Sequence, residues 1–542
     1  MFIKITKSKN NQYVQLVESY RENGKTKHKT LLNLGRLEEI QNNPGIQRLA
    51  KRLLELSSAS KCVDLFSASE AKILNWGYLV YQKIWNQFDL PKLLKKLVAQ
   101  RKVQFNFNDA CFLMTVQHLL NPKSKRGAFL NQGQYLNLPE VNLNHLYRSL
   151  DLLCEGKTAL EEAIFEKNRN LFNMQVDVVF YDVTTFSFES VKADSLRDFG
   201  FSKNGKFNEV QVVMGLLIDC EGRPIGYELF PGSTFDGKTM EAVLELMEKR
   251  FNIRRVVVVA DRGLNSKLNL KRIRDKGYGY IVASRIRKLG KSIQEQILTS
   301  EGYLTLEEGF RYKTFAYLNR FKDEDGQVHE LHETLVATYS EERAAKDRAD
   351  RERLVDKANH LLSNQGLINA GFKRGGRKYL KAVSVTNKTS WVLNETAIEN
   401  DSRFDGYYAI QTSETGMSAA EVIEAYHHLW KIEESFRIMK STLEVQPVFH
   451  WTESRIKGHF VICFLAFLLE RTLEFKLRKA QCPASPERIR EALNSMCFAE
   501  IEFEGEKYLV KTKATDLSKA ILRALRISPP KNVLPANEFK IL

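Results

Sequence analysis

The spacing of apolar and polar residues changes along the chain and indicates three kinds of region. In residues 1–38, apolar and polar side chains alternate over short runs, which predicts strands joined by tight turns. Residues 44–170 carry apolar side chains at helical spacing, for example over 71–88 and 109–120, which predicts a mostly helical region. From residue 174 onward, β-branched runs alternate with amphipathic segments, as expected for an α/β domain.

The elements predicted over 174–286 follow a definite order. Residues 174–189 and 209–219 are rich in β-branched and aromatic residues, and 225–232 completes a hairpin with the second of these strands. A helix, a buried strand, a second helix and a last strand follow. With a further helix at 419–445, this order is that of an α/β ribonuclease H-like core.

The segment 419–445 is the most strongly patterned helix in the sequence. Ser418 and Glu421 form a capping-box signal at its start. Apolar residues then recur at helical spacing and predict a buried stripe, made of Val422, Leu429, Ile432, Phe436, Met439 and Leu443. A second row of side chains repeats every seven residues, at Tyr426, Glu433 and Lys440. This row is either a site for chemistry or a solvated face, and the helix alone does not decide between them.

More than a hundred residues separate the last core strand from this helix. Their strand-like runs, with an exposed charged helix at 340–364, predict a mainly β insertion subdomain inside the catalytic core. The basic β N-terminal domain and the basic patches of the helical region are candidates for DNA contact, and a solvated basic surface is the alternative for both. The expected regions are a basic β N-terminal domain at 1–43, a helical DNA-binding region at 44–170, a ribonuclease H-like core at 171–289 and 418–474, an insertion subdomain at 290–417, and a mixed C-terminal region at 475–542.

Charge and cysteine content narrow the class of protein. The 542 residues contain 82 Lys and Arg against 66 Asp and Glu, a net charge of +16. This surplus favours a polyanionic partner, most commonly nucleic acid, although an anionic membrane or an acidic protein also attracts such a chain. The seven cysteines form no CxxC pair, and the apolar run at 460–469 is too short to span a bilayer. We expect a cytoplasmic, reduced protein.

Three carboxylates stand at positions typical of a catalytic site. Asp182 lies inside an apolar strand, Asp261 ends a buried one, and Glu433 belongs to the patterned helix. Singly, each has an ordinary explanation: a hydrogen-bonded carboxylate, a turn cap or a solvated side chain. Together they match the needs of two-metal phosphoryl transfer, because Mg²⁺ prefers hard oxygen ligands and clustered carboxylates repel one another without cations.

The motifs around these carboxylates resemble those of bacterial insertion-sequence DDE transposases of the superfamily with a Tyr-Arg-Glu-Lys signature, the hairpin-forming, cut-and-paste type. The family spaces these four residues with two, three and six residues between them. The sequence has Tyr426, Leu429, Glu433 and Lys440 at these positions, so Leu429 replaces the signature Arg. The segments YDVTTF around Asp182 and ADRGL around Asp261 are also similar to the family.

The resemblance implies roles for individual residues. Asp182, Asp261 and Glu433 would bind two Mg²⁺ ions, with Mn²⁺ as a substitute. DNA phosphates would be bound by the signature residues and by neighbours that compensate for Leu429, namely Tyr426, Lys440, His428, Lys431 and Arg437. Trp391 is a candidate for holding a flipped base, although a role in a strand core is the stronger explanation.

The function expected from the resemblance is that of a DNA transposase. It would bind the terminal inverted repeats of its own element as a homodimer, cleave double-stranded DNA and join the ends to a target, without contact to a membrane. As a bacterial protein it would be cytoplasmic and associated with the nucleoid. The alternatives are a ribonuclease H-like nuclease, or a catalytically inactive, transposase-derived DNA-binding protein.

Overall fold

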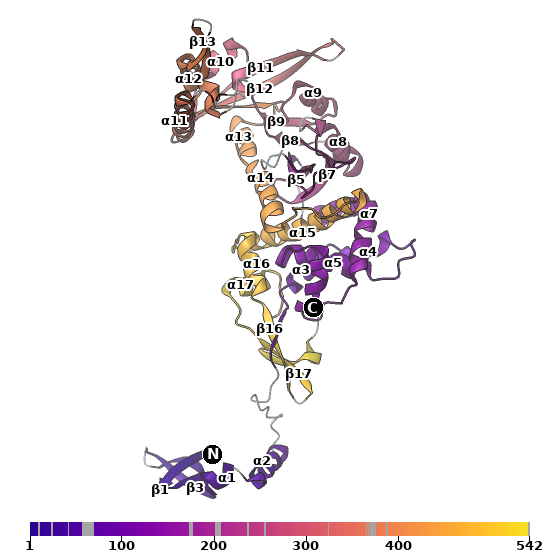
Figure 1. Ribbon diagram of the computed structural model, residues 1–542, viewed down its shortest axis with the longest axis vertical. Helices are drawn as coiled ribbons and strands as arrows, with labels where there is room; N and C mark the ends of the chain where they lie inside the picture. Colours follow the sequence, from indigo (N-terminus) through magenta and orange to yellow (C-terminus); the bar gives the residue numbers. More distant parts are fainter. Residues whose placement is uncertain are drawn as a thin grey trace. The chain divides into compact units, whose positions relative to one another are not determined.

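Figure 1 shows the computed structural model of the chain. The structure describes residues 1–8, 11–22, 25–41, 43–56, 70–172, 177–200, 208–235, 238–253, 256–323, 325–364, 366, 368, 375–385, 388–503 and 505–539. Two compact units are present, one made of 1–72, 500–509 and 535–537 and the other of 73–499, 510–534 and 538–542. Among the helices of these described residues, none combines the length and hydropathy that a membrane crossing requires.

The N-terminal region is a small antiparallel sheet, as predicted. Strand β2 pairs with both of its neighbours, and Val14 and Val17 on this strand are its buried apolar residues. A tight turn was predicted at ENGK, residues 22–25, and its two central residues lie outside the described residues. The elements are β1 (Phe2–Ser8), β2 (Asn11–Glu22), β3 (Lys25–Arg36), α1 (Leu37–Gln41) and α2 (Pro44–Leu56).

The region after residue 70 is mostly helical, with one correction to the prediction. Residues 71–88 do not form one helix, because they begin with the strand β4 (Lys72–Asn75). The side-chain amide of Asn75 donates to the carbonyl of Leu493 at 2.9 Å, a distant contact that local periodicity cannot anticipate. The helices that follow are α3 (Leu79–Gln87), α4 (Leu90–Leu97), α5 (Phe107–Leu120), α6 (Lys125–Asn131), η2 (Gln132–Gln134) and α7 (Leu143–Phe172).

The core elements follow the order along the chain that was predicted for a ribonuclease H-like domain. Three antiparallel strands, in the order β7-β6-β5, continue through parallel pairs into β8 and β9. The crossovers between the parallel strands are helical. The elements are β5 (Val178–Ser187), β6 (Gln211–Asp219), β7 (Pro224–Pro231), α8 (Met240–Glu245), the π-helix η4 (Leu246–Arg250), β8 (Val257–Ala260), α9 (Lys267–Asp275) and β9 (Gly279–Ala283).

The insertion, predicted as a mainly β subdomain inside the core, adds strands to the core sheet. Its strands β15, β12, β11 and β10 extend the core sheet beyond β9, which gives one sheet of nine strands. Helix α11 and the hairpin β13-β14 lie outside this sheet (Figure 1). The elements are η5 (Ile286–Lys288), α10 (Lys291–Leu298), β10 (Leu304–Glu307), β11 (Phe310–Lys322), β12 (Val328–Ser340), α11 (Glu341–Ser363), η7 (Gly375–Tyr379), β13 (Leu380–Val385), β14 (Lys388–Leu393), α12 (Glu395–Ser402) and β15 (Tyr407–Thr412).

The patterned helix is present, with its capping box, but it is not continuous. It consists of α13 (Ala419–His427), α14 (Trp430–Arg437) and the π-helix η8 (Ile438–Thr442). Tight i to i+3 hydrogen bonds, such as that from the amide of Ile432 to the carbonyl of Leu429, form the break between α13 and α14. All six residues of the predicted apolar stripe are buried.

The C-terminal part is a mixture of helices and strands, as predicted. Helix α15 carries the apolar run at 460–469, and that run is fully buried. The elements are α15 (Glu453–Lys479), α16 (Pro486–Asn494), β16 (Cys497–Phe503), β17 (Glu506–Lys511), α17 (Asp516–Ala524), β18 (Val533–Pro535) and η9 (Ala536–Glu538).

Candidate active site

Two of the predicted carboxylates stand at corresponding positions on neighbouring strands. Tyr181 of β5 pairs in parallel register with Ala260 of β8, so the next residue along each strand is an aspartate. One carboxylate oxygen of Asp182 accepts a hydrogen bond from the amide of Val183 at 2.7 Å, and one of Asp261 accepts from the amide of Arg262 at 2.6 Å. Asp261 is exposed at the carboxyl end of its strand, where α/β folds place ligands.

The pleat of β5 places Asp182 on the face of the sheet that carries the patterned helix. Tyr181 lies on the opposite face, where its hydroxyl donates to the Thr239 hydroxyl beside α8. Phe186 alternates in phase with Asp182 and contacts the ring of Phe460 on α15. The ammonium of Lys440 lies 5.5 Å from the same Phe186 ring.

Glu433 belongs to α14, which packs against β5 (Figure 1). Ile432, Ser435 and Phe436 are the buried residues of α14, whereas Glu433 is exposed. The three carboxylates do not form a group with ligand atoms within 4.8 Å of one another in the described part of the chain. The arrangement therefore joins two aspartates on adjacent strands to a glutamate on the helix that covers one of these strands.

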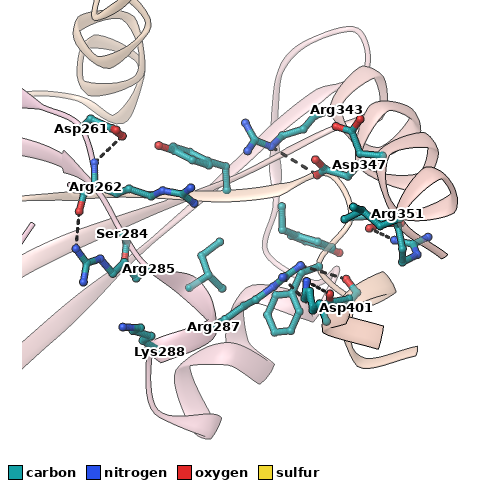
Figure 2. A pocket seen from close by; sticks show the side chains of 18 of the residues that line it. Asp261, Arg262, Ser284, Arg285, Arg287, Lys288, Arg343, Asp347, Arg351 and Asp401 are labelled. Carbon is teal, nitrogen blue, oxygen red and sulfur yellow. Dashed lines mark hydrogen bonds and ion pairs between the residues drawn. The ribbon is translucent and has the colours of Figure 1, made fainter. Parts of the chain in front are cut away.

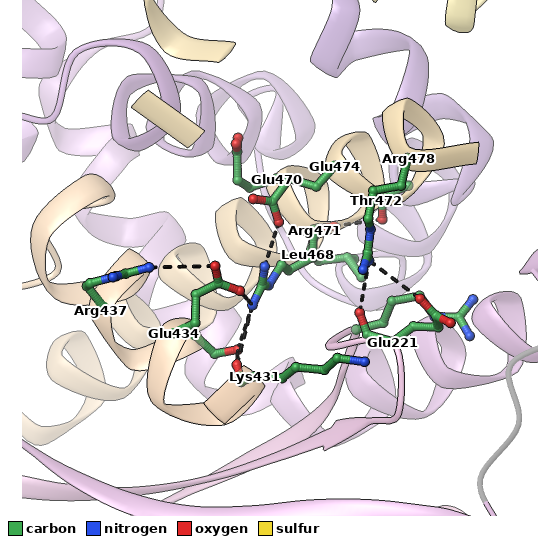
Figure 3. Close-up of polar contacts among 12 residues, drawn as sticks. Glu221, Lys431, Glu434, Arg437, Leu468, Glu470, Arg471, Thr472, Glu474 and Arg478 are labelled. Carbon is green, nitrogen blue, oxygen red and sulfur yellow. Dashed lines mark hydrogen bonds and ion pairs between the residues drawn. The ribbon is translucent and has the colours of Figure 1, made fainter. Parts of the chain in front are cut away.

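A buried arginine fixes α14 next to Glu433. Arg471 of α15 binds the carboxylate of Glu434 at 2.9 Å and that of Glu474 at 2.7 Å (Figure 3). It also donates to the Ser435 hydroxyl at 3.1 Å. Because these contacts hold two consecutive residues of α14, Arg471 sets the position of the helix that carries Glu433. The sequence offered no signal for this role, since Arg471 lies on a distant helix.

The residues predicted to contact DNA differ in their surroundings. The hydroxyls of Tyr426 and Tyr408 are hydrogen-bonded to each other, and burial, together with Tyr408, raises the pKa of Tyr426. Tyr426 therefore remains a neutral phenol. Leu429 is buried, with 7% of its surface exposed, so an apolar side chain suits the place of the signature Arg.

Three further candidates lie on α14 or at the break before it. Lys431 donates to the carbonyl of Cys220 at 2.6 Å, a contact that ties α14 to the turn between β6 and β7. Burial, followed by the charge of Lys431, lowers the pKa of His428, so its imidazole is neutral at pH 7. Arg437 is 74% exposed and forms an ion pair with Glu434 at 3.6 Å.

Trp391 packs in the insertion and not at the site carboxylates. It lies on β14 against the small apolar cluster around Ala358, Tyr379 and Leu380. The guanidinium of Arg377 stands 3.8 Å from the centre of its ring. These contacts match those of a strand-core residue.

A cavity of about 670 Å³ opens beside Asp261, toward the insertion (Figure 2). Its basic lining residues are Arg262, Arg285, Arg287, Lys288, Arg343, Arg351 and Lys378. Several are neutralised by ion pairs, for example Arg287 with Asp401 at 2.9 Å. Arg262, Arg285 and Lys288 make no ion pair with any described residue, so they leave positive charge next to Asp261.

Sequence reasoning missed this basic wall, although a signal was present. Residues 284–288 read SRIRK directly after the buried strand β9. A basic run that leaves a parallel strand at its carboxyl end is well placed to meet a ligand. The contribution of α11, through Arg343 and Arg351, depends on the tertiary fold and has no local signal.

Comparison with known proteins gives matches over most of the chain. Residues 3–62 match the family model described as IS1634 family transposase, N-terminal domain. Residues 175–469 match the model described as transposase DDE domain, which is more than half of the 542 residues. No curated protein matches the sequence. One similar solved structure is the cryo-EM structure of a piggyBac transposase synaptic complex with hairpin DNA, at 9% identity and a TM-score of 0.36, covering 79% of this chain and 82% of that chain.

Proposed function

Because the chain belongs to the transposase DDE domain family, we propose that Asp182, Asp261 and Glu433 are the carboxylates of its catalytic site. The chain is a DNA transposase, and enzymes of this family use divalent metal ions. The observation that carries the assignment is the parallel register that sets Asp182 beside Asp261, with the helix of Glu433 packed on the same strand.

The donor set fits divalent cations. Carboxylate oxygens are the ligands that Mg²⁺ prefers. Three neighbouring carboxylates repel one another unless positive charge lies between them. We propose two Mg²⁺ ions, for which Mn²⁺ substitutes. When bound, such ions activate the attacking water or 3′-hydroxyl and stabilise the leaving oxygen.

The surrounding residues bind and orient the DNA in this proposal. The neutral phenol of Tyr426 donates to a phosphate oxygen, and Lys440 supplies positive charge on the same side of the sheet. Arg262, Arg285 and Lys288 line the cavity along which the DNA strand runs away from Asp261. Lys431 acts indirectly, because its ammonium already holds the Cys220 carbonyl.

The reaction proposed is cut-and-paste transposition. A homodimer on the nucleoid DNA binds the terminal inverted repeats of its element, and hydrolysis frees a 3′-hydroxyl at each end. This hydroxyl attacks the opposite strand to form a hairpin, and after the hairpin is opened it attacks the target. In the two hydrolytic steps water displaces a 3′ oxygen and leaves a 3′-hydroxyl and a 5′-phosphate, whereas in the two transfer steps a 3′-hydroxyl displaces another 3′ oxygen and the number of phosphodiesters is unchanged.

The test uses labelled duplexes of the DNA that flanks the gene, incubated with Mg²⁺ and separated on denaturing gels. We expect cleavage at the element boundary by the wild type, a hairpin product, and no cleavage by Glu433→Ala. Glu424→Ala removes an exposed carboxylate from α13 and should cleave normally. Tight binding by the wild type without cleavage in Mg²⁺ or Mn²⁺ would identify a DNA-binding protein without this chemistry.

A further inference from the structure

A second group of basic side chains is buried away from the carboxylates. His118 lies on α5, Lys125 begins α6, His459 lies on α15, and His450 precedes α15. Lys125 is only 4% exposed and His118 only 3%. Lys125 lies in the basic segment NPKSKRG at 121–127, one of the basic patches of the helical region, so its burial is unexpected.

The hydrogen bonds of the group fix its protonation. The Nδ1 of His118 lies 2.9 Å from the Leu443 carbonyl and donates to it, which leaves Nε2 to accept from the Lys125 ammonium at 3.1 Å. Burial lowers the pKa of His118 to about 3 and that of Lys125 to about 8. At neutral pH the group therefore holds a neutral imidazole and a charged ammonium.

The ammonium has no carboxylate to neutralise it. Among the described residues, no ion pair includes Lys125. The carboxylate in the cavity lining is that of Glu444, which is exposed and also makes no such pair. Burying an unpaired charge is costly, so its retention requires an explanation.

A cavity of about 130 Å³ adjoins the ammonium. Hydrogen-bond donors on its wall are Lys123, Ser124, Tyr147 and His450. Phe449, also in the lining, is 58% exposed, and an exposed aromatic ring is a surface on which an unpaired base stacks. Positive charge, hydrogen-bond donors and an aromatic ring together match a nucleotide.

The same region contains ligand atoms for a metal, but its charge opposes one. One ring nitrogen each of His118 and His459 and the sulfur of Cys463 lie within 4.8 Å of one another. Lys125 binds the His118 Nε2 that would have to ligate the ion. Because an ammonium and a metal cation repel, the site favours an anion.

We propose that this cavity binds one phosphate group of the DNA strand, with Lys125 as its charged contact and Phe449 beside the adjoining base. The proposal rests on the function as a DNA transposase and adds a contact away from the carboxylates. Gln446, in the wall of this cavity, is connected to β5, the strand that carries Asp182. The amide of Ser187 at the end of β5 donates to the Gln446 side chain at 3.2 Å.

The experiment measures binding to duplexes from the element ends in which single phosphates are replaced, one at a time, by neutral methylphosphonates. For the wild type, we expect weaker binding at each contacted phosphate. For Lys125→Met, overall affinity should fall by about tenfold or more, and one methylphosphonate position should lose its effect. The salt dependence of log Kd should flatten by about 0.9 per lost phosphate contact.

Matched variants separate this contact from general charge. Lys249→Met removes an exposed lysine on η4 and should keep both the wild-type affinity and the wild-type methylphosphonate profile. His450→Asn, at a half-buried position, provides a second probe if Lys125→Met does not fold, and it should weaken the effect at the same phosphate. Glu433→Gln should keep the profile and lose cleavage, which separates failure of this inference from failure of the catalytic assignment.

Three results would overturn the proposal. The first is an unchanged methylphosphonate profile and affinity in Lys125→Met or, if that variant does not fold, in His450→Asn. The second is a rise in Tm with inorganic phosphate that Lys125→Met abolishes while its DNA profile stays wild-type, which would identify a free-phosphate site. The third is stoichiometric zinc in the purified protein that Cys463→Ser removes, which would identify a metal centre.

Discussion

Asp182 directly follows Tyr181, and Asp261 directly follows Ala260, the residue that pairs with Tyr181 on the neighbouring parallel strand. Parallel strands lie about 4.8 Å apart, so the register brings the two carboxylates to the same end of the sheet and to adjacent rows. Asp182 lies within β5, and Asp261 directly follows the last residue of β8. The parallel pairing of the two strands therefore brings the aspartates together, and the site also needs Glu433 from a helix.

Two consecutive glutamates on α14 should behave in opposite ways. Glu433 is exposed, whereas Glu434 binds the buried Arg471 at 2.9 Å. We expect Glu433→Gln to abolish cleavage and change the free energy of unfolding by no more than about 0.5 kcal/mol. Glu434→Gln should lower it by about 1–3 kcal/mol, because Arg471 loses a charged partner. Denaturant unfolding measures both, and equal stability losses would contradict this division of roles.

Two exposed lysines near the cavity beside Asp261 form a second matched pair. Lys288 lines the cavity, and Lys291 begins α10 outside the lining. Lys288→Ala should weaken DNA binding and reduce the salt slope by about 1, whereas Lys291→Ala should do neither. Fluorescence anisotropy at several salt concentrations measures both slopes. Equal effects of the two substitutions would mean that only the overall charge matters.

The buried carboxyl of Glu470 predicts a pH-dependent stability difference. Burial, and then the charge of Glu474, raises the pKa of Glu470 to about 8, while the Tyr81 hydroxyl donates to it. Above pH 4.5 the unfolded chain releases this proton and the folded chain keeps it, so folding loses stability as pH rises toward 8.

Glu470→Gln removes this titration and keeps an acceptor for Tyr81. Its stability relative to the wild type should therefore rise between pH 5 and pH 8, by on the order of 1 kcal/mol per pH unit. Thermal unfolding across this range measures the difference. A difference that stays constant with pH would show that Glu470 is ionised in the folded protein.

The core was predictable from sequence because its signals are local. The β-branched run that carries Asp182 and the apolar run before Asp261 are strands whatever surrounds them, and their order predicts the sheet. The capping box at Ser418 and the buried stripe from Val422 to Leu443 likewise depend only on neighbours in sequence, and both are present.

The remaining features depend on contacts between distant residues. Asn75 lies in a strand and not a helix because its surroundings include Leu493. The insertion strands pair with the core sheet, and their own residue pattern does not indicate which strands they pair with. The seven-residue repeat singled out Glu433, but it could not reveal the role of Glu434, because that role depends on Arg471 on another helix.

The most direct test of the carboxylate site changes a ligand atom instead of removing it. Asp261→Cys replaces a hard oxygen with a soft sulfur, which Mg²⁺ binds poorly and softer ions such as Mn²⁺ accept more readily. We predict that this variant binds DNA normally, does not cleave it with Mg²⁺ and regains cleavage with Mn²⁺, while Asp261→Ser stays inactive with both. Cleavage by Asp261→Cys with Mg²⁺ at the wild-type rate would contradict the assignment of Asp261 as a metal ligand.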